Sequence, residues 1–332
     1  MVSRTRGEPA EWLGRILREG GAPGLWEALA ERLSPTDLQS LLLEVFRRRA
    51  AEVTPGALLR AYERSRFAAP SPVDPGDLAR LEAETHRRLA ARGFAGVALS
   101  PLCPLGTVSA VGTVDQNKVV STVRNSEVPA DSTNVLALEC AVRRRELLRA
   151  DPRSRERVRL AATSRVVRAQ PPPGPGMWAH FALLGLCTAG RDEGSFVFQT
   201  AALAEHLAAH LDVLDGAREL GYRIEAVRVL ITDLSGGRHR PALGDRVLSP
   251  LAEAHPDVAF GFDDERDRGR GYYGDACLEI LATTAGGDEI SLGDGGFTGW
   301  TAALLSNAKE RLLISGLGLE RLCDAFGPPR RT

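Results

Sequence analysis

Arg168 is one of two arginines that follow apolar, strand-like segments and are well placed to bind phosphate. It stands just after residues 158–167, and a proline- and glycine-rich loop, residues 171–176, separates it from His180 and Phe181. A guanidinium held by a rigid strand can bind two phosphate oxygens at once. An aromatic ring across the same hairpin could stack on a purine. Taken alone, the pattern is also typical of an ordinary hairpin with a solvated arginine.

The second arginine, Arg321, follows a glycine-rich turn near the end of the sequence. Apolar residues lead into Gly316-Leu317-Gly318, and Arg321 stands three residues later, where a helix is expected to begin. Glycines let a ligand approach the backbone, and a helix N-terminus favours phosphate. The third glycine of GxGxxG is missing, and there is no GxxxxGK[ST] loop. A Rossmann or P-loop site is therefore not predicted, and the turn is either structural or a nucleotide contact of another kind.

Three further patterns are assigned no chemistry. His206 and His210 have the i,i+4 spacing of zinc ligands, but Leu207 replaces the glutamate of HExxH, so a packing or helix-surface pair is expected. The five cysteines include no CxxC pair, which argues against a zinc site or a disulfide framework and suits a reducing compartment. The arginine runs 47–49 and 143–145 are expected on solvated helix faces, with RNA contact as the alternative.

Length and charge exclude some classes of protein. A chain of 332 residues can hold one large domain, or a large domain with a small companion. The formal net charge is -1, so the chain has no general basic field for nonspecific nucleic-acid binding. No stretch reaches the roughly 18 consecutive apolar residues that a membrane helix needs. We therefore expect a cytoplasmic protein without a membrane segment.

Two regions differ in pattern. Residues 1–70 are predicted to form a helical extension, which the proline-rich stretch 68–76 ends. Residues 77–332 are predicted to form an α+β domain with a mixed or antiparallel sheet, because uneven strands separated by long loops and helices do not fit a parallel doubly wound sheet. The expected strands are residues 97–100, 113–120, 158–167, 181–187, 224–232, 276–282 and 311–315, and the long helices are 77–92, 132–149 and 198–220.

Six segments, in this order, resemble the signature elements of class II aminoacyl-tRNA synthetases of the histidyl type. The segments around Arg168 and Arg321 are similar to the second and third motifs of that class. The other four resemble the dimer-forming first motif, the Pro-Glu-x-Thr segment, the Arg-Gly-Leu-Asp-Tyr-Tyr signature and the glycine-rich turn after it, at residues 93–101, 129–133, 268–273 and 293–297. The resemblance implies a class II synthetase-like catalytic domain, an antiparallel sheet flanked by helices.

The resemblance also implies an ATP site, with magnesium. Arg168 would contact the α-phosphate, Arg321 the γ-phosphate, and Arg268 the α-phosphate or the forming adenylate. The other implied ATP contacts are Gln170 and His180 near the adenine, Phe181 stacked on it, and Gly316 and Gly318. The implied substrate contacts are Asp131, Thr133, Leu183, Cys187, Tyr272, Tyr273, Gly295 and Gly296. Asp275 and Glu279 are candidate magnesium carboxylates, although no protein-held metal site is predicted.

Several positions depart from the family pattern. Gln170 and Gly271 stand where the family has glutamate and aspartate, and Leu183 and Cys187 replace the polar groups that would read an imidazole. About ten residues follow Arg321 in this sequence, so an anticodon-binding domain is not expected.

We therefore predict a free-standing module that activates an amino acid or related carboxylic acid through an adenylate, without charging tRNA in the usual way. It is expected to dimerise through residues 93–101 and to pass its product to a carrier protein, a small molecule or a nonstandard tRNA. One alternative is a noncatalytic paralogue that regulates a partner enzyme, like the synthetase-like subunit of ATP phosphoribosyltransferase. The other is a scaffold whose N-terminal helices dock a partner.

Overall fold

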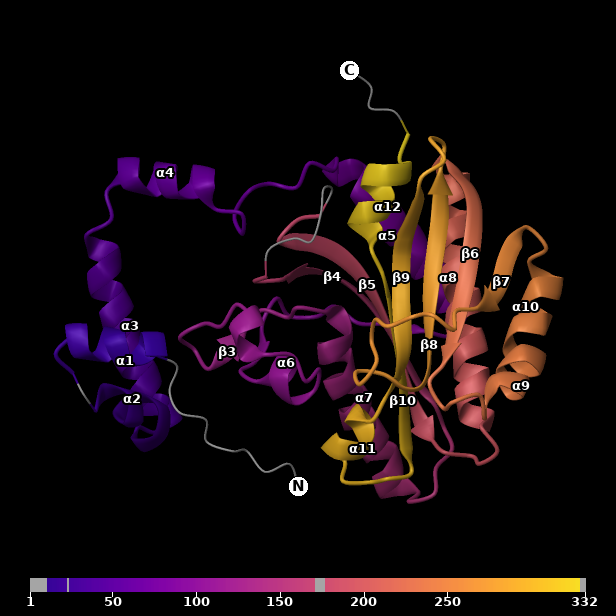
Figure 1. Ribbon diagram of the computed structural model, residues 1–332, viewed down its shortest axis with the longest axis horizontal. Coiled ribbons are helices and arrows are strands. Elements are labelled where there is room, and N and C mark those ends of the chain that lie inside the picture. The colour runs from indigo at the N-terminus through magenta and orange to yellow at the C-terminus, as the bar shows by residue number, and fades with distance from the viewer. Residues whose placement is uncertain (1–10, 23, 171–176, 329–332) are drawn as a thin grey trace. The chain divides into compact units, whose positions relative to one another are not determined.

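The computed structural model describes residues 11–22, 24–170 and 177–328, which fall into two compact units (Figure 1). The first unit is Met1–Tyr62 with Thr122–Asn125, and the second is Glu63–Ser121 with Ser126–Thr332. Apart from the stated gaps, no helix between residues 11 and 328 has both the length and the apolar character of a membrane span.

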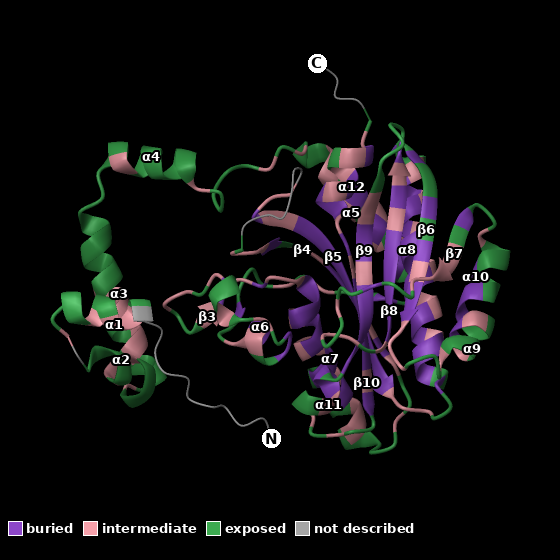
Figure 2. Cartoon of the chain, viewed as in Figure 1, coloured by how far each residue is buried: buried purple, intermediate pink, exposed green. Residues whose placement is uncertain are grey.

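The first unit is helical. Its elements are α1 (Glu11–Glu19), α2 (Leu25–Glu27), the π-helix η1 (Ala28–Arg32), α3 (Pro35–Ala51) and most of α4 (Pro55–Arg64). Ser34 caps α3 by accepting a hydrogen bond from the Asp37 backbone N–H, and Pro35 suits the first helical position. None of the described side chains between residues 12 and 62 is buried (Figure 2). These helices therefore have no core of their own.

The second unit is built on a mixed sheet of eight strands. The four central pairings from β4 to β8, and the pairing of β8 with β6, are antiparallel, whereas β1–β4 and β6–β7 are parallel. In spatial order the strands are β1 (Ala95–Gly96), β4 (Val158–Val167), β5 (His180–Arg191), β10 (Glu310–Leu317), β9 (Glu289–Thr298), β8 (Gly274–Thr284), β6 (Ile224–Asp233) and β7 (Val258–Phe262). A small antiparallel pair, β2 (Cys103–Pro104) and β3 (Ser126–Glu127), lies apart from this sheet.

Helices cover both faces of the large sheet. On one face, α5 (Pro75–Ala91), α8 (Val197–Glu219) and α12 (Leu319–Phe326) enclose the main apolar core. On the other, α7 (Ser132–Ala150) and α11 (Trp300–Leu304) pack over β4, β5 and β10 around a second core. The remaining short helices are α6 (Thr107–Ala110), η2 (Gln116–Lys118), α9 (Arg240–Leu243), η3 (Gly244–Leu248) and α10 (Ser249–Ala254).

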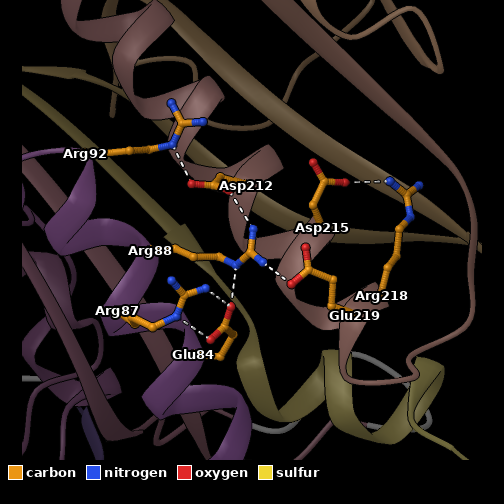
Figure 3. A network of polar contacts seen from close by, with 8 residues as sticks. All are labelled: Glu84, Arg87, Arg88, Arg92, Asp212, Asp215, Arg218 and Glu219. Carbon is orange, nitrogen blue, oxygen red and sulfur yellow. Dashed lines mark hydrogen bonds and ion pairs between the residues drawn. The ribbon is translucent and has the colours of Figure 1, made fainter.

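Charged side chains fasten α5 to α8 (Figure 3). Arg88 of α5 donates to Glu84 of its own helix and crosses to Asp212 of α8, 2.8 Å away, and to Glu219. Arg92 donates to the second oxygen of Asp212. The guanidinium of Arg88 crosses α8 beside Gly216, whose missing side chain makes room for it.

The structure confirms the α+β prediction and corrects several element boundaries. The strands expected at 97–100 and 113–120 are wrong: β1 ends at Gly96, and the second stretch contains η2 and a left-handed Thr113 (φ 53). Strands β7 and β9 were not expected. Residues 293–297, read as a turn, lie inside β9, where glycine is required because a methyl group on Gly295 would lie 2.5 Å from the Ile314 carbonyl oxygen of β10.

Candidate functional site

A cavity of about 600 Å³ opens beside α7, on the face of the sheet that this helix covers. It is lined by residues from the start of α7, the segment after β4, strands β5, β9 and β10, the segment before β8 and the first turn of α12, so chain segments far apart in sequence contribute to it. Twelve of the predicted site residues line it: Asp131, Thr133, Arg168, Gln170, Phe181, Leu183, Arg268, Tyr272, Tyr273, Gly316, Gly318 and Arg321.

Arg168 directly follows β4, and its side chain contacts the residues just before α7 and a ring on β5. Its Nε donates to the Ala130 carbonyl oxygen at 3.2 Å, and its Nη2 lies 3.7 Å from a carboxylate oxygen of Asp131. The guanidinium carbon also lies 4.9 Å from the centre of the Phe181 ring. A purine can stack on this face of Phe181 only if Arg168 moves off it, and a phosphate would give the guanidinium another partner.

Arg321 lies in the first turn of α12, after Gly318 caps the helix N-terminus. Its Nη1 donates to the Ser291 carbonyl oxygen at 2.8 Å, and no ion pair of Arg321 occurs within the described residues. Burial lowers the pKa of this guanidinium. A half-buried cation that has only a carbonyl partner is suited to an anionic ligand.

Arg266 and Asp294, which were not predicted as site residues, also line the cavity. Arg266 is buried and donates to Asp294, and its Nη1 lies 3.6 Å from Glu279. Arg268 donates to the other oxygen of Glu279 at 2.6 Å. Burial raises the pKa of the Asp294 carboxyl despite the nearby Arg266. Arg266 precedes Arg268 by two positions, and that spacing was the only sequence signal for it.

The end of the cavity near α7 carries a carboxylate beside apolar groups. Asp131 caps α7 by accepting hydrogen bonds from the backbone N–H and the hydroxyl of Thr133, at 2.9 and 2.7 Å. Leu183 and Ile314 line the same cavity. Tyr272 packs edge-on against Tyr273, with 4.9 Å between the ring centres, and burial raises the pKa of both phenols.

Four predicted site residues lie outside the cavity lining. Cys187 is fully buried beneath it, with its thiol near the Thr133 carbonyl oxygen. Gly295 faces the α8 side of the sheet against Ser315, and Gly296 packs behind the Tyr273 ring. His180 bonds Arg165 and the Ala69 carbonyl oxygen instead of facing the cavity.

The two candidate magnesium carboxylates are not free to act as a pair. Asp275 accepts a hydrogen bond from Gln199 of α8, whereas Glu279 is bonded by Ser291 and Arg268. Burial raises the pKa of Glu279, but these hydrogen bonds outweigh it and hold the pKa below its usual value. Within the described residues, no group of three His, Cys, Asp or Glu side chains is arranged to hold a metal ion.

The histidine pair of α8 is internal. His206 and His210 are both fully buried and bond the hydroxyl of Ser315 at 2.8 and 2.7 Å, and His206 also bonds Thr188. Burial lowers the pKa of His210 to about 4. The pair therefore packs α8 onto β5 and β10.

Comparison with known proteins gives structural matches alone. No family model and no curated relative matches the sequence. The crystal structure of apo histidyl-tRNA synthetase from S. aureus matches with a TM-score of 0.55 and 14% identity, covering 76% of this chain and 67% of that one. An ATP phosphoribosyltransferase regulatory subunit/histidyl-tRNA synthetase from Bacillus halodurans C matches with a TM-score of 0.53 and 15% identity, covering 80% and 84%. At such identities the likeness concerns the fold, and the chain has the class II histidyl-tRNA synthetase-like fold that its six ordered segments predict.

Proposed function

We propose that the cavity binds ATP together with an amino acid or related carboxylic acid and joins them as an acyl-adenylate. The observation that carries this proposal is the placement of Arg321: a half-buried guanidinium without an ion-pair partner in the described structure faces the same cavity as Arg168 and Phe181. Between them, two cations and an aromatic ring offer what a purine nucleoside triphosphate needs.

The reaction asks little of the protein beyond position and charge. A carboxylate oxygen of the acid attacks the α-phosphorus of ATP, a new oxygen–phosphorus bond forms, and the bond to the β-phosphate breaks to release pyrophosphate. Arg168 and Arg268 would stabilise the negative charge that develops at the α-phosphate, and Arg321 would hold the γ-phosphate. On this scheme, ATP binding draws Arg168 away from Phe181 and frees the ring for the adenine.

The acid would bind at the α7 end of the cavity. Asp131 offers a carboxylate to the ammonium group of an amino acid, while Leu183 and Ile314 surround the space for its side chain. A small or apolar side chain suits these neighbours better than an imidazole does, because an imidazole would leave its ring nitrogens unpaired there.

Magnesium would reach this site on the phosphates of ATP. Mg²⁺ in nucleotide sites is usually held by one or two carboxylates plus phosphate oxygens. Glu279 is already paired with Arg268 and Ser291, and Asp275 with Gln199. The residues thus do not fit a prebuilt metal site.

The alternative is a ligand-binding regulatory subunit. It is favoured by the existing pairing of two cavity arginines, Arg168 with Asp131 and Arg268 with Glu279, which leaves Arg321 as the cavity cation without an ion pair in the described structure. The Bacillus halodurans C protein, described as an ATP phosphoribosyltransferase regulatory subunit/histidyl-tRNA synthetase, is compatible with the same possibility. Exposed apolar side chains in the N-terminal helices, such as Trp12 and Phe46, would supply a docking surface for the regulated enzyme.

A homodimer is proposed under either function, through the segment that resembles the first synthetase motif. Leu102 and Leu105, just after it, are exposed large apolar residues, as an interface requires. Sedimentation velocity of the wild type and of Leu102→Glu tests this. A monomeric wild-type protein would refute the proposal.

ATP–pyrophosphate exchange across the twenty amino acids separates the two functions. Exchange with one amino acid, lost in Arg168→Ala and Arg321→Ala, is the expected result for the enzyme. If none of the twenty supports exchange although calorimetry shows that ATP binds, the regulatory function is favoured. If ATP does not bind at all, the nucleotide site itself is wrong.

A further inference from the structure

A short segment ahead of α5, residues 66–71, grips the hairpin formed by β4 and β5 from outside the cavity. Arg66 donates through Nη1 to the Gln170 carbonyl oxygen at 2.9 Å, and through Nη2 to that of Ala169. These two carbonyls directly follow Arg168. Ala69 contributes its own carbonyl oxygen, which lies 2.7 Å from Nε2 of His180 on the opposite strand. The segment therefore holds both strands of the hairpin.

The same segment reaches the helix that bears Arg321. Ser71 donates its hydroxyl to Glu320, the neighbour of Arg321, and this carboxylate is only 1% exposed. Glu320 also accepts from the Ala182 backbone N–H at 2.6 Å and from Arg165 at 3.0 Å. A buried carboxylate is stable only when donors surround it, so these contacts are mutually dependent.

We propose that residues 66–71 form a strap that sets the position of Arg168 relative to Arg321, and that Arg66 and Glu320 are its positioning residues. This inference rests on the proposed nucleotide site, whose two arginines come from the hairpin and from α12. Neither Arg66 nor Glu320 lines the cavity, so both act through the backbone they hold. The strap is also the covalent link to the N-terminal helices, since α4 ends at Arg64.

Backbone hydrogen bonds also hold the end of β4, where the Val167 N–H donates to the Pro129 carbonyl oxygen at 3.1 Å. The Arg168 N–H donates to the Ala179 carbonyl oxygen, and the Ala169 N–H to that of Lys118. Without Arg66, the two carbonyls after Arg168 would lose their charged donor. A displacement of about 1 Å in a phosphate-binding group costs on the order of a hundredfold in rate. The strap is thus able to control the site without touching a ligand.

Substitution of Arg66 by methionine in the full chain tests the strap, with Arg48→Met as the matched control. Arg48 is an exposed arginine whose bonding partner within the described residues is Glu44 of its own helix. The first readout is hydrogen–deuterium exchange of residues 177–183 and 165–170. Arg66→Met should speed exchange there, with exchange in β8 and β6 unchanged and no effect of Arg48→Met. The second readout is ATP affinity by calorimetry, which should fall about tenfold in Arg66→Met.

Glu320→Gln provides a second variant that keeps the acceptor for Ala182 but removes the charge facing Arg165. It should give the same faster hydrogen exchange and weaker ATP binding. If the wild type catalyses ATP–pyrophosphate exchange, KM for ATP should rise more than kcat falls. Unchanged hydrogen exchange in Arg66→Met, or faster exchange with unaltered ATP affinity, would overturn the strap. If the wild type binds no ATP, the nucleotide site fails, whereas hydrogen exchange still decides whether the strap holds the hairpin.

Discussion

Replacing Arg321 by methionine should separate ligand binding from folding. Without ligand, burial of this guanidinium adds little to the free energy of unfolding, whereas its charge should contribute strongly to ATP affinity. Methionine keeps the length and the apolar stem of the side chain while it removes the charge. In the empty protein, Arg321 has a single described hydrogen bond, to the Ser291 carbonyl oxygen. Burial already disfavours its charged form, as its lowered pKa indicates.

The expected change in the free energy of unfolding is much smaller than the expected change in the free energy of ATP binding. Loss of the bond to Ser291 costs about 1 kcal/mol, and relief from burying an unpaired cation offsets part of this, so the free energy of unfolding should change by less than about 1 kcal/mol. A guanidinium on a phosphate makes two charge-assisted hydrogen bonds, together worth about 3 kcal/mol. ATP should therefore bind roughly a hundredfold more weakly to the variant.

Calorimetric titration with ATP and urea denaturation measure both quantities on the same preparations. Arg238→Met is the control, because Arg238 is exposed and likewise bonds one carbonyl oxygen, that of Ser235. The reasoning is refuted if Arg321→Met binds ATP as tightly as the wild type does. It is equally refuted if the control loses affinity to the same extent.

Three other changes test the packing, the cavity and the pH response. Gly216→Ala should lower the free energy of unfolding by about 1–3 kcal/mol in urea, since its methyl group would strike Arg88, whereas Gly244→Ala (φ -61, open space) should not. Gly316→Ala should leave stability nearly unchanged, because its nearest new contact is 3.4 Å, yet should weaken ATP binding about tenfold; equal affinity would show that the nucleotide does not reach β10. His210 has a folded pKa of about 4 against 6.5 unfolded, so stability should fall, by up to about 3 kcal/mol, as pH drops from 6.5 to 4. In thermal denaturation, the stability of His210→Gln should depend less steeply on pH than that of the wild type. An identical pH dependence would exclude this histidine as the cause.

The sequence predicted the long elements well because their patterns carried the information. The strand 158–167 and the helix at 132–149 agree closely with β4 and α7. Strand β9 was missed because three glycines and an aspartate among its ten residues erase the alternation that marks a strand. Close packing explains them: Gly293 and Gly295 lie against β10, where Gly295 has no room for a side chain beside Ser315, and Gly296 lies against the Tyr273 ring. Such a constraint comes from tertiary packing and leaves no periodic trace.

For the candidate site, too, the sequence predicted some placements correctly and could not predict others. Ordered motifs placed Arg168, Phe181 and Arg321 on one cavity, and the structure brings them together. His180 was expected beside the adenine, but Arg165 and the strap draw its ring away from the cavity. No spacing rule could reveal that, because the competing partner at Ala69 comes from a distant part of the chain.

The sheet order explains why two distant arginines meet. Strand β10 is antiparallel to β5, so its end at Leu317 lies level with Leu184, near the start of β5. Strand β4 also ends at this edge, which brings Arg168 and the first turn of α12 together. A triphosphate bound between them would tie the hairpin to α12 from inside, as Glu320 ties them from outside. The nucleotide and Glu320 would thus both link the hairpin to α12. Nucleotide binding should therefore stabilise the contacts of the strap, and loss of these contacts should lower nucleotide affinity.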